Sequence, residues 1–205
     1  MPILTEHEAT EARGTATRTR ILEAALQCVE RWGLAKTSLE DVAAAAGLSR
    51  ATVYRYFPGG REQLISDTVT FEVGNFLEGL GTAMADDAGL AAKLEHGLQH
   101  GHRAIEEHTL LHQILSTEPE ALLKELARTG PSMMAAVREA IADDLRREPL
   151  REGVDVDEAA DYLTRMFLSY LGSQGRWDLD DRAQVDRLVQ TQFLAGVVRQ
   201  APSDG

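Results

Sequence analysis

The chain has 205 residues, of which 43% are hydrophobic, and a formal net charge of −12. This is enough apolar material for one ordinary domain, or for a small domain joined to a larger one. No apolar run approaches the roughly 20 residues of a membrane-spanning helix, and the polar N-terminus has no signal-peptide core. The single cysteine, Cys28, has no intramolecular disulfide partner. We therefore expect a cytoplasmic protein with no membrane partner.

The negative charge is distributed unevenly along the chain. Residues 13–65 hold eight Lys and Arg against five Asp and Glu, whereas residues 66–205 hold 13 against 25. Neutralising phosphates requires only local positive charge. The N-terminal part is therefore compatible with DNA binding even though the whole chain is acidic.

Apolar residues recur mainly at helical spacing, which predicts an all-α protein with nine to ten helices. Residues 1–14 lack periodicity and predict a disordered tail. The first helix is expected over residues 17–32, and two short helices follow it. Caps, prolines and glycines then set the limits of the remaining helices: 61–80, 86–108, 109–116, 119–130, 131–147, 155–171 and 180–199.

Residues 38–57 have the spacing of a helix-turn-helix. Ser38 and Ser49 are suited to cap two short helices, and Gly47 lies where the turn between them needs positive φ. The apolar residues share the inner faces of these helices: Leu39, Val42, Ala43, Leu48, Val53 and Phe57.

Polar residues on the other faces of this motif suit DNA. Arg50 and Thr52, at the exposed start of the second helix, are candidates for base contacts, because a guanidinium can bind guanine. Arg55 could contact bases or phosphates, or be an ordinary solvated arginine. Arg18 and Arg20 could reach the flanking backbone or lie on a solvated face. The hydroxyl-bearing candidates, which would position the protein on phosphates, are Thr37, Ser38, Ser49, Tyr54 and Tyr56.

The stretch from Arg18 to Leu64 closely resembles the tetracycline-repressor (TetR) family, notably in the run 52–57 that leads into Pro58. The resemblance implies a helix-turn-helix DNA-binding domain over 15–60 and a ligand-binding and dimerisation domain over 61–205. It also implies a homodimer whose heads read a palindromic double-stranded DNA operator. The turn after Pro58 is one residue longer than usual in the family. The basic residue that often begins the fourth helix and contacts a phosphate then corresponds to Arg61.

The expected effector is a small apolar or amphipathic molecule that releases the DNA, and no cofactor is expected. Methionine and aromatic side chains can line an adaptable pocket, although they also fill ordinary cores. The candidate ligand-binding residues are Phe71, Phe76, Leu80, Arg103, His108, Leu111, His112, Leu115, Met133, Met134, Val137, Met166, Phe167 and Tyr170.

Histidines provide an alternative signal in the same part of the chain. His96 and His100, and likewise His108 and His112, are four residues apart, a spacing that can chelate a transition metal. No cysteine joins them and no HExxH motif is present, so we assign no metal ligands. A metal-responsive regulator using His96–His112 remains the alternative function, together with a regulator that has no small ligand.

The last two expected helices carry apolar or small residues at helical spacing. Under the family resemblance they form a four-helix bundle between two subunits, whereas the alternative is ordinary packing within one chain. The candidate interface residues are Tyr162, Ser169, Ser173, Leu188, Val189, Gln192, Phe193, Gly196 and Val197.

The sequence does not favour an enzyme. It contains no GxSxG motif and no phosphate-binding glycine loop. Adjacent acidic residues such as Asp143 and Asp144 point apart on a helix, so they do not form a catalytic pair. We therefore predict a ligand-responsive transcriptional repressor.

Overall fold

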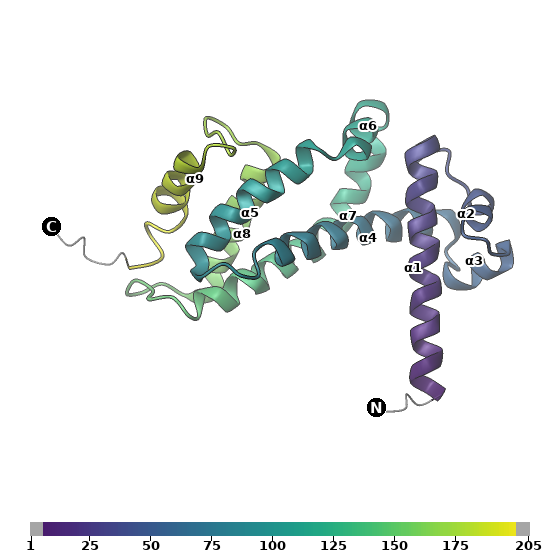
Figure 1. Cartoon of the computed structure of the whole chain (residues 1–205), viewed down its shortest axis with the longest axis horizontal. Helices are drawn as coiled ribbons and strands as arrows, with labels where there is room; N and C mark the ends of the chain where they lie inside the picture. The colour runs from purple at the N-terminus through teal and green to yellow at the C-terminus, as the bar shows by residue number, and fades with distance from the viewer. Residues whose placement is uncertain (1–5, 200–205) are drawn as a thin grey trace. The chain divides into compact units, whose positions relative to one another are not determined.

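The computed structural model describes residues 6–199, which form nine α-helices, one π-helix and no strand (Figure 1). The all-α prediction is therefore confirmed. None of the described helices is long and apolar enough to cross a membrane. The elements are α1 (Glu6–Trp32), α2 (Leu39–Ala45), α3 (Arg50–Tyr56), α4 (Gly60–Ala83), α5 (Gly89–Glu106), α6 (Thr109–Thr117), α7 (Pro119–Leu145), α8 (Val156–Gly172), α9 (Arg182–Leu188) and the π-helix η1 (Val189–Phe193).

The N-terminal helix is longer than the sequence pattern indicated. Residues 6–14, expected to belong to a disordered tail, are the first turns of α1, and residues 1–5 of that expected tail lie outside the described part. Glu, Ala and Arg make up most of residues 6–14. These residue types have high intrinsic helix propensity, so a helix can extend there without an apolar stripe.

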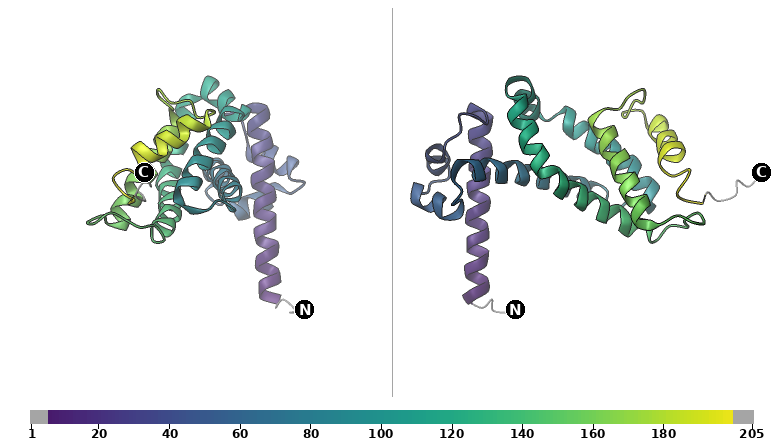
Figure 2. Two further views of the ribbon diagram at one scale, coloured as in Figure 1. Left: turned by 60° about the vertical axis from the view of Figure 1, so that its left-hand side comes forward. Right: turned by 180° about the vertical axis from the view of Figure 1, so that it is seen from behind.

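The two helices expected over 119–130 and 131–147 are one continuous helix, α7 (Figure 2). Pro131 lies inside it, although a proline in a helix interior costs about 3 kcal/mol. Apolar packing on both sides of the proline opposes that cost: Leu122 belongs to one core and Val137 to another. The prediction of a break at Pro131 was wrong because tertiary packing is not visible in local sequence.

The C-terminal helix is shorter than expected. The helix predicted over 180–199 is capped by Asp181, runs through α9 and the π-helix, and ends at Phe193. The following segment returns to the α7–α8 connection, where the Arg151 amide donates to the Val197 carbonyl at 3.0 Å. These backbone bonds replace the helical ones that the prediction assumed.

The chain forms two compact units. Unit 1 holds the chain up to Val73 together with Leu110–Thr129, and unit 2 holds Gly74–Thr109 and the chain from Gly130 onward. The division passes through α4 and α7, so each of these helices contributes residues to both units.

Unit 1 has two apolar clusters. The first joins α1, α2, α3 and the start of α4, which lie together in Figure 1. The second joins α1 and α4 to α6 and the first half of α7, and its buried members are Val29, Leu34, Ile65, Ile114 and Leu122. Helices α1 and α4 therefore take part in both clusters, and through the second they pack against α6 and α7.

The loop between α1 and α2 is held from two directions. The Arg61 guanidinium, at the start of α4, donates to the carbonyl oxygens of Leu34, Ala35 and Thr37 at 2.5–2.9 Å. The Glu118 carboxylate, between α6 and α7, accepts the Ala35 amide at 2.7 Å. Charged hydrogen bonds of this kind are stronger than neutral ones. They fix the direction in which the chain enters α2.

Close approach also explains the glycine at the start of this loop. Gly33 has φ +86°, and a Cβ atom there would lie 2.0 Å from Glu118 Oε1. Only glycine meets both conditions, since other residues rarely adopt this φ and would collide with the carboxylate.

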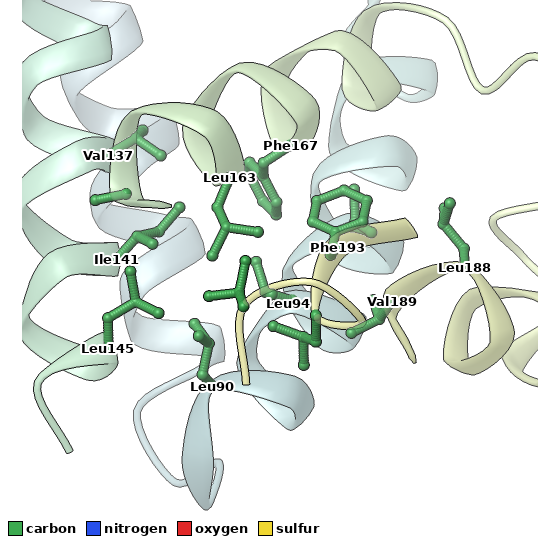
Figure 3. Packing of buried hydrophobic residues seen from close by; sticks show 14 of the residues in the cluster. Leu90, Leu94, Val137, Ile141, Leu145, Leu163, Phe167, Leu188, Val189 and Phe193 are labelled. Atoms are coloured by element: carbon green, nitrogen blue, oxygen red, sulfur yellow. The ribbon is translucent and has the colours of Figure 1, made fainter. Parts of the chain in front are cut away.

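Unit 2 is built around one large apolar cluster from α4, α5, α7, α8, α9 and the π-helix. In Figure 3, side chains of α7 and α8 converge on those of α5 and the C-terminal segment. Each buried leucine or phenylalanine contributes about 1.5–3 kcal/mol. The labelled residues are Leu90, Leu94, Val137, Ile141, Leu145, Leu163, Phe167, Leu188, Val189 and Phe193.

Arg61→Ala should destabilise the protein by about 2–3 kcal/mol, because three carbonyl oxygens lose a charged donor. Urea unfolding should show a lower midpoint with an unchanged slope. Arg55→Ala, which removes an exposed arginine of α3, is the matched control. An unchanged midpoint for Arg61→Ala would contradict the role given to this guanidinium.

Glu95→Gln should stabilise the protein increasingly as the pH rises. Burial raises the pKa of the Glu95 carboxyl, and the Asp186 carboxylate raises it further. A folded pKa above the unfolded value of about 4.3 means that stability is present below that pH and is lost as the pH rises through the folded pKa. The amide does not titrate and avoids this loss.

Thermal unfolding between about pH 4.5 and pH 7.5 measures this effect. The gain in Tm for Glu95→Gln over the wild type should be largest at the upper end. Glu120→Gln, at an exposed position of α7, should show no such trend. A variant less stable than the wild type at pH 7.5 would disprove the account.

Candidate nucleic-acid interface and ligand cavity

The helix-turn-helix begins with two serine caps, as the sequence predicted. Ser38 Oγ accepts the Asp41 amide at 3.2 Å and Ser49 Oγ accepts the Thr52 amide at 3.1 Å. Gly47, in the turn, has φ +63°. Each cap satisfies a backbone donor that its short helix leaves open.

Apolar anchors decide which face of α3 is outward. Val42 on α2, Val53 on α3 and Phe57 after it have no exposed surface. With Val53 and Phe57 fixed inward, Arg50, Tyr54 and Arg55 are exposed and Thr52 and Tyr56 are half-buried. The outward face of α3 therefore carries two guanidinium groups and a phenol.

Arg50 and Tyr54 form an ordered pair on this face. Arg50 Nη2 donates to the Tyr54 hydroxyl at 3.4 Å, and the guanidinium carbon lies 5.3 Å from the centroid of the Tyr54 ring. Tyr54 and then Glu40 raise the pKa of the Arg50 guanidinium, so the group stays charged. A stacked guanidinium has fewer conformations to lose when it binds.

Glu40 on α2 is the acidic partner of the same arginine. Its Oε1 lies 2.6 Å from Arg50 Nη1, and both side chains are more than half exposed. Exposed pairs of this kind contribute about 0–1 kcal/mol. A phosphate or base edge can therefore replace Glu40 at small cost.

One threonine and two arginines of the head have partners within the protein that the sequence did not predict. Thr37 was expected to contact phosphate, but its side chain is 1% exposed and its hydroxyl donates to the Gly33 carbonyl at 2.8 Å. Arg61 was expected to contact phosphate too, whereas its Nε and Nη2 hold the α1–α2 loop. Arg18 pairs with Asp67 at 2.7 Å. Thr37 and Arg61 therefore hold the head together, whereas the Arg18 side chain remains 44% exposed.

Unit 2 contains an apolar cavity of about 320 Å³ between α4, α5, α7 and α8. Its volume is near the lower end of the usual range of small-molecule sites, about 300–1,000 Å³. An ion pair between Lys93 and Asp144, with Nζ and Oδ1 at 2.7 Å, lies on its wall. The lining residues are Leu77, Glu78, Leu80, Gly81, Met84, Leu90, Lys93, Leu94, Ala136, Val137, Ala140, Ile141, Asp144 and Phe167.

Three of the residues expected to bind a ligand line this cavity: Leu80, Val137 and Phe167. The others lie elsewhere. Phe71 packs in the head, Leu111 in the second cluster of unit 1, and Tyr170 against Phe193. Leu115 is exposed, and Arg103 pairs with Asp180 at the surface. Phe76, Met133, Met134, Met166, His108 and His112 are also absent from the lining.

The polar part of the cavity was not predicted from the sequence. Lys93 and Asp144 are far apart in sequence, and each looks like a solvated position on its own helix. A signal was available, because Lys93 lies among Leu90, Leu94 and other apolar residues of α5 at helical spacing. A lysine at the border of an apolar stripe often extends its stem over apolar surface.

The histidines form pairs but no larger cluster. His96 Nδ1 lies 2.9 Å from Asp87 Oδ2, and the His96 and His100 rings meet edge to face at 6.2 Å. Within the described part of the chain, no three His, Cys, Asp or Glu side chains are placed to hold a metal ion. Nothing in this geometry favours the metal-responsive alternative.

Several residues expected at a dimer interface are in the core of unit 2. Leu188, Val189, Phe193 and Val197 are 0–7% exposed within the single chain. Helical spacing identified an apolar stripe correctly but could not say which surface it packs on. The remaining candidates, Tyr162, Ser169, Ser173, Gln192 and Gly196, are exposed.

Comparisons with known proteins agree with the geometry of the head. Residues 21–68 match the family model described as "Bacterial regulatory proteins, tetR family". The uncharacterized HTH-type transcriptional regulator Rv1255c of Mycobacterium tuberculosis (strain ATCC 25618 / H37Rv) is 28% identical over 170 residues, covering 83% of this chain and 82% of that protein.

Solved structures show the same fold. A putative TetR-family transcriptional regulator from Rhodococcus sp. superposes with a TM-score of 0.60 at 19% identity, covering 87% of this chain and 99% of that one. The triclosan complex of SmeT, the repressor of the Stenotrophomonas maltophilia multidrug efflux pump SmeDEF, gives a TM-score of 0.57 at 24% identity, covering 91% and 93%. Residues 21–68 therefore match the tetR family of bacterial regulatory proteins, and most of the chain is similar to an HTH-type transcriptional regulator.

Proposed function

We propose that the protein represses transcription by binding a palindromic operator as a homodimer, with α3 of each copy in a major groove. The observation that carries this proposal is the outward face of α3, where Arg50 and Tyr54 are exposed and stacked, and Arg50 pairs with an exposed glutamate. Arg50 and Thr52 would read base edges. Ser38, Ser49, Tyr54, Arg55 and Tyr56 would contact phosphates.

The cavity of unit 2 supports the second part of the proposal, release by a small effector. It is lined mostly by apolar side chains, with one ion pair on the wall. Such a site suits an apolar or amphipathic molecule. The effector would bind the form of the protein that does not bind DNA more tightly, and so shift the population toward it.

The exposed face of α8 supports the dimer. Tyr162 is 42% exposed, and its hydroxyl donates to the Gln192 carbonyl at 2.6 Å. Ser169 and Ser173, further along α8, are small and exposed. An exposed face that combines an aromatic ring with small side chains suits two-fold packing.

The full chain should therefore sediment as a dimer at micromolar concentration. Tyr162→Glu, which places a charge on the proposed interface, should shift the equilibrium toward the monomer. Glu120→Gln on α7 is a control away from α8. A monomeric wild type at micromolar concentration would rule out this part of the proposal.

Arg50→Ala should weaken operator binding by about 1–3 kcal/mol, because it removes a bidentate base or phosphate contact. The thermal midpoint should stay close to the wild-type value, since the side chain is 60% exposed. A mobility-shift titration on the upstream intergenic DNA measures the affinity.

Two further variants make this titration decisive. Arg176→Ala, which removes an exposed arginine of unit 2, should leave operator affinity unchanged. Glu40→Gln, which removes the competing carboxylate, should increase it. Undiminished binding by Arg50→Ala would reject the assignment of this arginine.

A further inference from the structure

The cavity of unit 2 has an apolar body and one charged wall. Leucine, alanine, isoleucine and phenylalanine side chains from α4, α5, α7 and α8 form the body, and Figure 3 shows Val137, Ile141 and Phe167 on one side with Leu90 and Leu94 on the other. The charged wall holds Lys93 of α5 and Asp144 of α7. The charge of the polar headgroup that an amphipathic ligand can carry is therefore determined at this wall.

Asp144 has two cationic partners. Its Oδ1 accepts Lys93 Nζ at 2.7 Å and Arg147 Nη1 at 3.1 Å. The Asp144 side chain is 16% exposed and that of Arg147 72% exposed. If Lys93 turns toward another anion, Asp144 keeps Arg147 and is not left as a buried, unpaired charge. This avoids the usual cost of breaking a partly buried ion pair.

The Lys93 ammonium can donate further hydrogen bonds. An ammonium group carries three N–H donors, and one of them meets Asp144. The Lys93 side chain is 28% exposed, so its interactions are less screened than those of a fully solvated lysine. A carboxylate at this wall would gain a charge-assisted hydrogen bond.

Other headgroups fit the wall less well. A cationic head would meet the Lys93 ammonium and an Asp144 that two cations already neutralise. Glu78, the other acid of the lining, is exposed, so solvent screens its attraction. An uncharged hydroxyl would gain only an ordinary hydrogen bond.

We propose that the cavity binds an amphipathic monoanion, a hydrocarbon chain with a terminal carboxylate, whose headgroup pairs with Lys93 while Asp144 stays paired with Arg147. This proposal rests on the proposed function only in taking the cavity as the effector site. Binding itself requires no DNA.

Three probes with the same tail test the headgroup. Decanoate, decanol and decyltrimethylammonium are titrated calorimetrically into the full-length protein, below their critical micelle concentrations. Decanoate should bind at least tenfold more tightly than decanol, and the cation should bind most weakly. Equal affinities, tighter binding of the cation, or no binding of any probe would overturn the proposal.

Variants of the charged wall test the residues. Lys93→Met keeps an apolar stem and should reduce decanoate affinity to about that of decanol, with a much smaller loss of decanol binding. Lys93→Arg should retain the preference for decanoate, and Asp144→Asn should strengthen it by removing the competing acid. Lys124→Met, an exposed lysine of α7, is the matched control. If Lys93→Met leaves decanoate binding unchanged, or weakens decanol equally, Lys93 does not select the headgroup.

Operator affinity without any probe is measured on the same proteins. Loss of DNA binding there would concern the proposed regulator and not the headgroup preference. Decanoate that binds through Lys93 but leaves the DNA complex intact would confirm the site and remove its role as an effector site.

Discussion

The arrangement of unit 1 depends on how the loop between α1 and α2 is held. This loop carries several backbone carbonyls and amides that no helix satisfies, and Arg61 and Glu118 supply charged partners for four of them. Without these partners, the entry into α2 would be free to move, and α3 is positioned through α2. The position of the exposed face of α3 therefore depends on two charged residues that are themselves half-buried.

The same arrangement links the head to α6 and α7. Glu118 precedes α7, and the second apolar cluster of unit 1 joins Val29 of α1 to Ile114 and Leu122. A change in the position of α6 or of the first half of α7 would act directly on the α1–α2 loop. Unit 1 is thus larger than a three-helix head, and it contains the contacts through which a signal could reach α3.

The exposed face of α3 and the cavity of unit 2 each contain a cation whose acidic partner can be replaced. At α3, Arg50 is exposed and stacked on Tyr54, and its acidic partner is an exposed carboxylate, so it can exchange that partner at little cost. In unit 2, Lys93 can exchange partners for another reason, because Asp144 has a second cationic partner, Arg147. In both places a cation beside apolar or aromatic surface has a replaceable acidic partner. This property suits a protein that binds and releases its ligands.

Local sequence predicted much of this protein. The caps at Ser38 and Ser49, the positive φ of Gly47 and the buried Val53 and Phe57 follow from interactions within a few residues. The most specific signal was therefore the helix-turn-helix, and the outward position of Arg50 follows from it.

Only the tertiary structure decided the rest, because the deciding contacts join residues distant in sequence. Helical spacing marked Leu188, Val189 and Phe193 as apolar, but their burial in unit 2 depends on α5 and α8. Pro131 continues a helix because packing on both sides outweighs its local cost. Arg61 meets carbonyls more than twenty residues away, and Lys93 meets Asp144 on the wall of the cavity although they lie on different helices. The sequence determined which side chains could face DNA, and the fold determined which charges remain available to do so.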